Sequence, residues 1–175
     1  GATWHPPIGR DVLLFYDERA IRQVCALVRK VQPAVILTHP PQDYMEDHTT
    51  TCRLAVTGAF TRGIPNFRSL PARPPSLAPL TIYHAMPHGL RDPLRRAWKP
   101  EAWVNTAAVQ RERLAALACH RSQHEWLGAS QGMNSYLASA AEEARELGRR
   151  SKKFTHAEGW TRHLHLGFGA ERVLR

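Results

Sequence analysis

The sequence lacks the features of a membrane-spanning or disulfide-stabilised secreted protein. No run of about 18 consecutive apolar residues occurs, so we expect no membrane span. The first residues, GATWHPPIGRD, do not show the charged and then apolar order of a secretion signal. Cysteine is scarce, because Cys25, Cys52 and Cys119 lie far apart and none forms a CxxC pair. An odd, scattered set predicts reduced, mostly buried thiols in a compartment such as the cytoplasm.

Acidic residues are too few to balance the basic ones. The chain has 24 Lys and Arg against 15 Asp and Glu, which gives a formal net charge of +9. This balance suits a nucleic-acid partner, because basic surfaces gain affinity by releasing phosphate counterions. It equally suits a solvated, arginine-rich surface. Outside 91–99 and 149–153 the basic residues are dispersed, and no nucleic-acid-binding motif accompanies them, so we expect a partner other than nucleic acid.

The first half of the chain has the pattern of an open α/β sheet. Apolar residues recur at helical spacing after Asp17, and Pro33 prevents the helix from continuing. Residues 34–38 form an apolar run without alternation, which predicts a buried strand of a parallel sheet. Asp47 is the predicted N-cap of a helix over 48–61. In such sheets ligands bind at the carboxyl ends of the strands, where the loop 39–48 lies.

The second half continues the alternation of strands and helices. A proline-rich stretch over 64–80 predicts a surface excursion. The further predicted elements are a strand over 80–85, a short strand over 102–105, a helix from Asn105 or Thr106 to His120, a helix from Met133 to Leu147 with Gly148 as a left-handed C-cap, and a final edge strand over 153–160. The predicted class is α/β.

The loop 39–48 concentrates residue types that bind metals. These are His39, Asp43, Glu46, Asp47 and His48. A hydrolytic zinc site needs about three protein ligands and an open position for water. From the residues alone, three interpretations stand open: a self-contained metal site, a helix cap beside surface histidines, or one part of a larger divided site.

Three segments resemble, in order, the LmbE-like / PIG-L family of metal-dependent N-deacetylases. They are ILTHPPQDYMEDHTTTCRLA (36–55), RLAALACHRSQ (113–123) and FTHAEGW (154–160), and the similarity extends over roughly Asp11 to Phe168. The resemblance implies a Rossmann-like three-layer α/β sandwich with a mainly parallel sheet. It also implies an N-acetylglucosaminyl deacetylase type of activity, which uses Zn²⁺ or another divalent metal to remove an acetyl group from an N-acetylated amino sugar or its conjugate.

The resemblance also implies roles for individual residues. His48, in the Asp-His dipeptide, would bind the metal, and Asp47 would orient a catalytic group by hydrogen bonding. Met45 stands where many family members have a histidine, and His39, His84 and His88 are the candidates to replace it, with His39 assigned to catalysis. The expected substrate contacts are Asp43, Tyr44, Arg53, His84 and His88.

One part of the family's metal site is missing from this sequence. The His-Pro-Asp-Asp motif, which supplies the other ligands and the general base, does not occur. We therefore expect one LmbE-like domain over 1–175 that lacks its first βα units. The alternative is a non-catalytic sugar- or partner-binding domain derived from the same fold, and the sequence is compatible with a homo-oligomer in either case.

Overall fold

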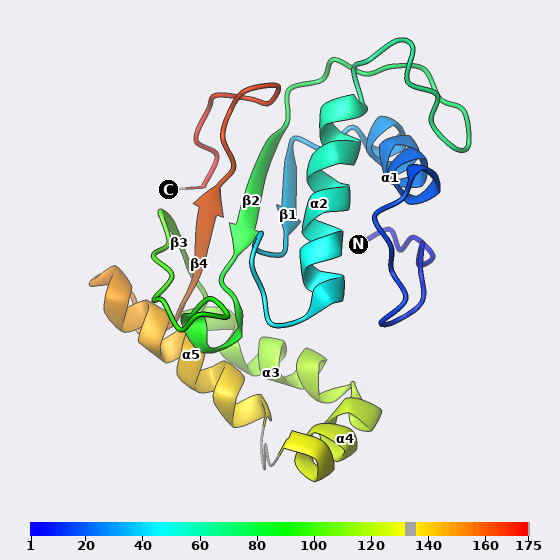
Figure 1. Ribbon diagram of the computed structural model, residues 1–175. Coiled ribbons are helices and arrows are strands. Elements are labelled where there is room, and N and C mark those ends of the chain that lie inside the picture. The colour runs from blue at the N-terminus through cyan, green and yellow to red at the C-terminus, as the bar shows by residue number, and fades with distance from the viewer. Residues whose placement is uncertain (132–135, 175) are drawn as a thin grey trace. The chain divides into compact units, whose positions relative to one another are not determined.

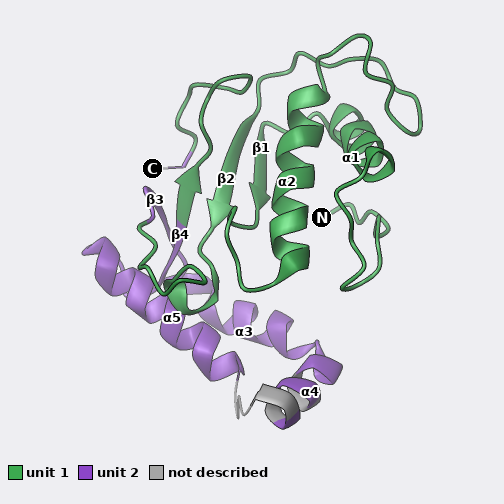
Figure 2. Cartoon of the chain, in the orientation of Figure 1, with its two compact units in different colours: residues 1–99, 160–173 green, residues 100–159, 174–175 purple. Residues whose placement is uncertain are grey.

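The computed structural model describes residues 1–131 and 136–174, which form an α/β fold with a four-stranded mixed sheet (Figure 1). The elements are α1 (Glu18–Val31), β1 (Val35–Thr38), α2 (Glu46–Thr61), β2 (Thr81–Ala85), η1 (His88–Leu90), β3 (Ala102–Asn105), η2 (Ala107–Val109), α3 (Gln110–Ala118), α4 (Arg121–Gln131), α5 (Tyr136–Ser151) and β4 (Ala157–Arg162). The chain separates into two compact units, residues 1–99 with 160–173 and residues 100–159 with 174–175 (Figure 2). Within the described part of the chain, no helix combines the length and apolar character that a bilayer-spanning segment needs.

The strands are ordered β1-β2-β4-β3. β1 pairs with β2 in parallel, from Val35↔Thr81 to Thr38↔His84, which confirms the predicted parallel strand. β4 is antiparallel to β2, so the prediction of a mainly parallel sheet is wrong. β4 also lies between β2 and β3, whereas an edge strand was predicted there. A short apolar run has no periodicity that distinguishes the direction or position of a strand, which is why the sequence did not reveal either.

The predicted burial of β1 on both faces is also wrong. β1 stands at the end of the described strand order, and the side chain of Leu37 is 55% exposed. The opposite side of the strand contributes Ile36 to the core of the first unit, which is centred on Val28, Ala59, Leu80 and Ile82. A strand at a sheet end needs only one apolar face, and a four-residue run is too short to show that alternation.

α1 begins and ends where its sequence signals predict, and it packs closely against α2. α1 is N-capped by Asp17, whose carboxylate accepts the N–H of Ala20 at 2.8 Å, and it ends at Gln32 in the left-handed conformation (φ 47°) before Pro33. α1 and α2 pack closely, because a Cβ at Gly58 would lie 2.5 Å from Cγ1 of Val24. A larger residue at position 58 would therefore force the helices apart.

A buried guanidinium holds the C-terminal end of α2. Arg29 of α1 is 5% exposed and donates to four main-chain carbonyls: Arg62 (2.9 Å), Arg73 (2.8 Å), Ile64 (2.9 Å) and Thr61 (3.3 Å). The last carbonyls of a helix have no intrahelical partner and carry the negative end of the helix dipole. Arg29 satisfies them and also fixes the start of the irregular segment 62–80, which contains the predicted proline-rich excursion over 64–80.

Two helices of the second unit have other ends than predicted. The helix expected from Asn105 or Thr106 to His120 begins as the 3₁₀ turn η2, where Asn105 Oδ1 accepts the N–H of Ala107 at 3.1 Å, and α3 stops at Ala118. The helix expected from Met133 is α5, and its predicted start lies outside the described residues.

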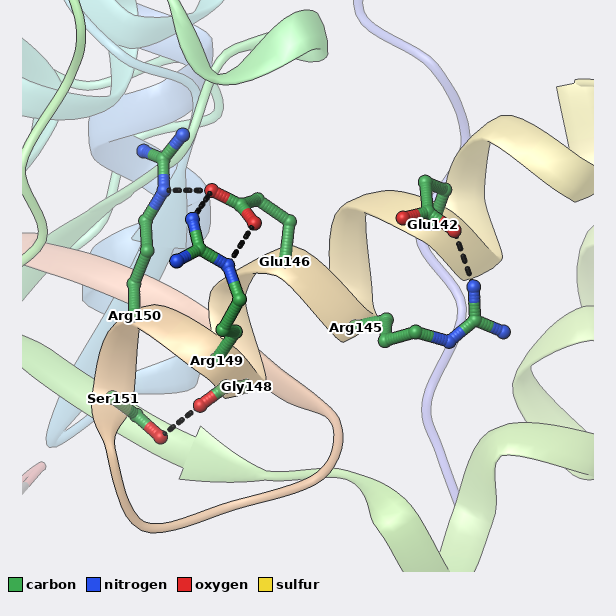
Figure 3. A network of polar contacts seen from close by, with 7 residues as sticks. All are labelled: Glu142, Arg145, Glu146, Gly148, Arg149, Arg150 and Ser151. Carbon is green, nitrogen blue, oxygen red and sulfur yellow. Dashed lines mark hydrogen bonds and ion pairs between the residues drawn. The ribbon is translucent and has the colours of Figure 1, made fainter.

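Gly148 is not a C-cap, as predicted, but an interior residue of α5. A Cβ at Gly148 would lie 2.5 Å from the carbonyl carbon of Thr155, so glycine permits a close approach of the following loop. The helix ends at Ser151, whose hydroxyl donates to Gly148 O at 2.6 Å (Figure 3). The same hydroxyl accepts from the N–H of Phe154 at 3.1 Å. Lys152 then takes the left-handed conformation (φ 57°) that was assigned to glycine.

Ion pairs along the last turns of α5 stabilise its exposed face. Glu146 accepts from Nε of Arg149 at 2.7 Å and from Nε of Arg150 at 2.8 Å, and Glu142 pairs with Arg145 (Figure 3). The hydrogen bonds from Arg149, and next those from Arg150, lower the pKa of Glu146 to about 2. At neutral pH the Glu146 carboxylate is therefore fully ionised.

The Arg29 network generates a prediction for stability. Arg29→Lys keeps the charge but replaces a planar fork of five donors with a single ammonium of three. At least one of the four carbonyls loses its donor, so the free energy of unfolding in urea should fall by about 1 to 3 kcal/mol. Arg19→Lys, at an exposed position of the same helix, should change it by less than about 0.5 kcal/mol. Equal free energies of unfolding for Arg29→Lys and Arg19→Lys would contradict the role assigned to Arg29.

Candidate metal and catalytic site

The candidate site begins where β1 ends. Parallel strands bring their carboxyl ends to one edge of a sheet, and the register Thr38↔His84 aligns the ends of β1 and β2. The chain leaves β1 at His39, runs through the loop 39–45 and enters α2 at Glu46. This path brings the strand end and the first turn of α2 together, as predicted for the 39–48 loop.

Among the described residues, one group of three side chains has the spacing of a metal site. Ligand atoms of His39, Asp43 and His48 all lie within 4.8 Å of one another, and the three residues are partly buried. The Asp43 carboxylate is only 3% exposed, and its Oδ1 lies 3.0 Å from Nδ1 of His48. The same oxygen accepts the N–H of Met45 at 3.1 Å. Asp43 thus joins the loop to the first turn of α2.

The Asp43 contact selects one tautomer of His48. A carboxylate accepts hydrogen bonds, so Nδ1 of His48 carries the proton and Nε2 keeps its lone pair. A carboxylate behind a histidine in this way orients the imidazole and raises its basicity toward a metal. Asp43 therefore has the orienting position that was predicted for Asp47.

The rings of His39 and His48 are stacked, with centroids 4.1 Å apart and planes inclined by 9°. A metal binds an imidazole nitrogen in the plane of its ring. Two nearly parallel, stacked planes cannot both contain the same ion, and tetrahedral coordination needs the two rings to be turned apart. The group therefore fits one imidazole ligand, His48, and joint coordination would require one ring to leave the stack.

The environment of His39 favours its neutral form. Burial, and next the neighbouring His48, lower the pKa of the His39 imidazole, and the Asp43 carboxylate partly offsets both effects. A neutral imidazole can take up a proton, which is compatible with the catalytic role predicted for His39.

The start of α2 differs from the prediction. The N-cap is Met45 and the helix begins at Glu46, so Asp47 lies in the first turn and is not the cap. Oδ2 of Asp47 instead accepts the N–H of Val12 at 2.5 Å, which attaches the N-terminal segment to α2. The Asp43 side chain accepts the N–H of Met45, and this turn lets the helix begin two residues before the predicted start at His48. Asp43 lies before the N-cap position, so the capping pattern in the sequence did not reveal its role.

The predicted substrate contacts fall into different environments. Tyr44 is 59% exposed and lies edge-on to His48 (centroids 5.8 Å), and the exposed His88 lies 6.3 Å from the Tyr44 ring. Tyr44 thus borders the candidate site, and the exposed His88 is a neighbour of Tyr44. The guanidinium of Arg53 lies over the ring of Tyr16, 4.1 Å from its centroid.

His84 is the most buried of the predicted site residues, at 4% exposure. Its Nδ1 lies 2.9 Å from the carbonyl oxygen of His39, and its Nε2 lies 2.9 Å from Nδ1 of His163. Sequence reasoning missed His163. The sequence does contain one signal for it, the alternation His-Leu-His-Leu over 163–166, directly after the last strand. Such an alternation places the histidines on one face, where one of them can contact a neighbouring strand.

Comparisons with known proteins identify the fold. No protein-family model and no curated protein sequence matches the chain. Among solved structures, the N,N'-diacetylchitobiose deacetylase from Pyrococcus horikoshii matches with a TM-score of 0.70 at 20% identity, over 94% of this chain and 58% of that one. The conserved protein TT1542 from Thermus thermophilus matches with a TM-score of 0.66 at 22% identity, over 89% of this chain and 63% of that one.

A third structure with the same fold is that of an enzyme with a different reaction. GalB, the 4-carboxy-2-hydroxymuconate hydratase from Pseudomonas putida, matches with a TM-score of 0.63 at 18% identity, over 92% of this chain and 62% of that one. The predicted LmbE-like resemblance is thus confirmed as a partial-length match of fold. The chain spans about three fifths of each of these structures. Identities this low establish a shared fold and not a shared reaction.

The buried histidines generate a prediction for the metal-free chain. Burial is the largest cause that lowers the pKa of His39, His84 and His163. The pKa of an unfolded histidine is about 6.5, so below that pH the unfolded chain binds more protons than the folded one. The contribution of these histidines to the free energy of unfolding should therefore be complete above about pH 6.5, and the free energy of unfolding should fall as the pH decreases toward 5.

The measurement is urea denaturation at constant ionic strength with a chelator present. Replacing His163 by Gln should reduce the dependence on pH, whereas His165→Gln, at an exposed position, serves as the control. A free energy of unfolding that rises on acidification from pH 7 to 5 would contradict this account.

Proposed function

We propose that this chain forms part of a metal-dependent hydrolase that removes an acetyl group from an N-acetylated amino sugar or its conjugate. The observation that carries the proposal is the Asp43–His48 pair at the carboxyl edge of β1, an imidazole oriented by a carboxylate with its Nε2 free. The match of fold to a deacetylase whose substrate, N,N'-diacetylchitobiose, is an N-acetylated amino sugar supports the choice of reaction.

The residues of the loop divide the work in this proposal. A divalent metal such as Zn²⁺, when bound, supplies polarisation of the acetamide carbonyl and a water of lowered pKa. Asp43 keeps the proton of His48 on Nδ1. His39, held neutral by burial, is the proposed site of proton transfer. Tyr44 and His88 are the proposed contacts to the sugar, because an aromatic face and an exposed imidazole suit a polar ring.

One observation favours the second candidate, a non-catalytic sugar- or partner-binding domain of the same fold. The stacked rings leave only one imidazole available to a metal, and a hydrolytic site needs about three ligands. A longer form of the protein that supplies a His-Pro-Asp-Asp segment would complete the metal site. Whether the longer form contains the missing metal ligands distinguishes the hydrolase from the non-catalytic binding domain.

The 175-residue chain by itself should bind zinc weakly. One imidazole cannot match the affinity of a three-ligand site, so we expect far less than one equivalent of zinc after dialysis, measured by atomic absorption. A tightly held equivalent that His39→Ala removes, and that the exposed control His165→Ala keeps, would instead establish a self-contained site in the loop and contradict this interpretation.

The longer form should be a zinc-dependent N-deacetylase that requires His48. His48→Ala should abolish both zinc binding and the release of free amine from an N-acetylglucosamine derivative. Asp43→Asn should keep the zinc and lower affinity or rate about 10- to 100-fold, because it removes only the orienting partner. Glu46→Gln, exposed in the same turn, is the matched control and should behave as the unmodified protein. Zinc and activity retained in His48→Ala would show that His48 is not a ligand.

A further inference from the structure

A pair of hydrogen-bonded histidines lies behind the candidate site. His84, on β2, is 4% exposed, and His163 follows β4. Nδ1 of His84 lies 2.9 Å from the carbonyl oxygen of His39, and Nε2 of His84 lies 2.9 Å from Nδ1 of His163. The pair therefore connects β4, β2 and the end of β1.

The hydrogen-bond partners determine both tautomers. A carbonyl oxygen only accepts, so Nδ1 of His84 carries a proton and donates it to His39 O. Nε2 of a neutral His84 is then the acceptor, so His163 donates through its own Nδ1–H. The lone pair of Nε2 of His163 is left free. His163 thereby keeps His84 in the tautomer that can bind the His39 carbonyl.

The carbonyl of His39 is the acceptor through which His84 attaches the start of the loop to β2. β1 ends at Thr38, and the two residues after His39 are prolines, which have no N–H to donate to the sheet. The His84 ring also lies against α2, where Sγ of Cys52 is 3.5 Å from Nδ1. Burial raises the pKa of the Cys52 thiol to about 11, so this neighbour stays an uncharged thiol. His84 thus touches both segments that supply the stacked rings, the strand end with His39 and the helix with His48.

We propose that His84 is a positioning residue: its Nδ1–H holds the main chain at His39, and this hold keeps the His39 ring stacked on His48. His84 does not contact the substrate in this account, because it is buried and both ring nitrogens have partners within the protein. Its consequence for catalysis rests on the proposed function. The consequence for the loop conformation does not.

Two amide substitutions separate the two hydrogen bonds of His84. In Asn the side-chain nitrogen is bonded to Cγ, as Nδ1 is in histidine, so His84→Asn keeps a donor for the His39 carbonyl. In Gln the amide lies one atom further out, near the place of Nε2, so His84→Gln keeps an acceptor for His163 and loses the donor to His39. A role limited to filling space would make the two variants alike.

The first measurement is NMR on the unmodified metal-free chain. Long-range ¹H–¹⁵N spectra should show His84 and His163 as Nδ1–H tautomers, and the ring protons of His39 and His48 should have the upfield shifts of stacked rings. His84 found as the Nε2–H tautomer would overturn the proposal, and this test does not depend on any variant being folded.

The second measurement compares the variants by the same spectra. The stacked-ring shifts of His39 and His48 should persist in His84→Asn and collapse in His84→Gln, while the exposed control His165→Gln leaves them unchanged. Shifts lost in His84→Asn, or kept in His84→Gln, would overturn the proposal. Since neither metal nor substrate is present, failure of the proposed deacetylase activity would leave these outcomes as they are.

A third measurement tests the link to catalysis in the longer form. Amine release should stay within a few-fold of the unmodified rate in His84→Asn and fall about 10- to 100-fold in His84→Gln, the range found when an orienting partner is removed. Equal losses in both variants would show that the His39 carbonyl contact does not position the catalytic loop.

Discussion

The site depends on one short piece of parallel pairing, the four residue pairs between β1 and β2. This register places the end of β1 beside His84, so that the loop leaves the sheet next to a buried imidazole that binds its first carbonyl. A shift of the register by one residue would move every side chain of β1 to the opposite face. The carbonyl of His39 would then no longer lie opposite Nδ1 of His84, and the stacked pair of His39 and His48 would lose its support.

The remaining polar contacts of the first unit stabilise the ends of the helices that carry the site. Asp43 determines where α2 begins, and Arg29 satisfies the carbonyls where α2 ends. His48 is placed between these two fixed ends, in the first turn of the helix. The helix that presents the proposed ligand is thus held at both termini by side chains from other segments, which suits a group that must keep its orientation when a metal binds.

Local signals in the sequence predicted much of the fold and only part of the site. The cap at Asp17 and the stop at Pro33 gave α1, because both act within one turn of the helix. The mixed sheet and the edge position of β1 depend on contacts distant in sequence, and nothing local encodes them. The interior place of Gly148 depends on the path of the loop that follows α5, which packs against it at Thr155. The loop was recognised from its metal-binding residue types. The stacked rings and the Asp43–His48 bond depend on the path of an irregular loop, which residue types do not specify. The His84–His163 pair joins residues 79 positions apart, so no local signal could reveal it.

The central claim is that His48 binds a metal through Nε2 while Asp43 holds Nδ1. The most direct test is anomalous scattering at the zinc absorption edge from crystals of the longer form soaked with zinc. The account predicts one peak about 2.0–2.1 Å from Nε2 of His48, with Asp43 still hydrogen-bonded to Nδ1. A peak bonded to Nδ1 with Asp43 displaced, or a zinc site that excludes His48, would contradict it.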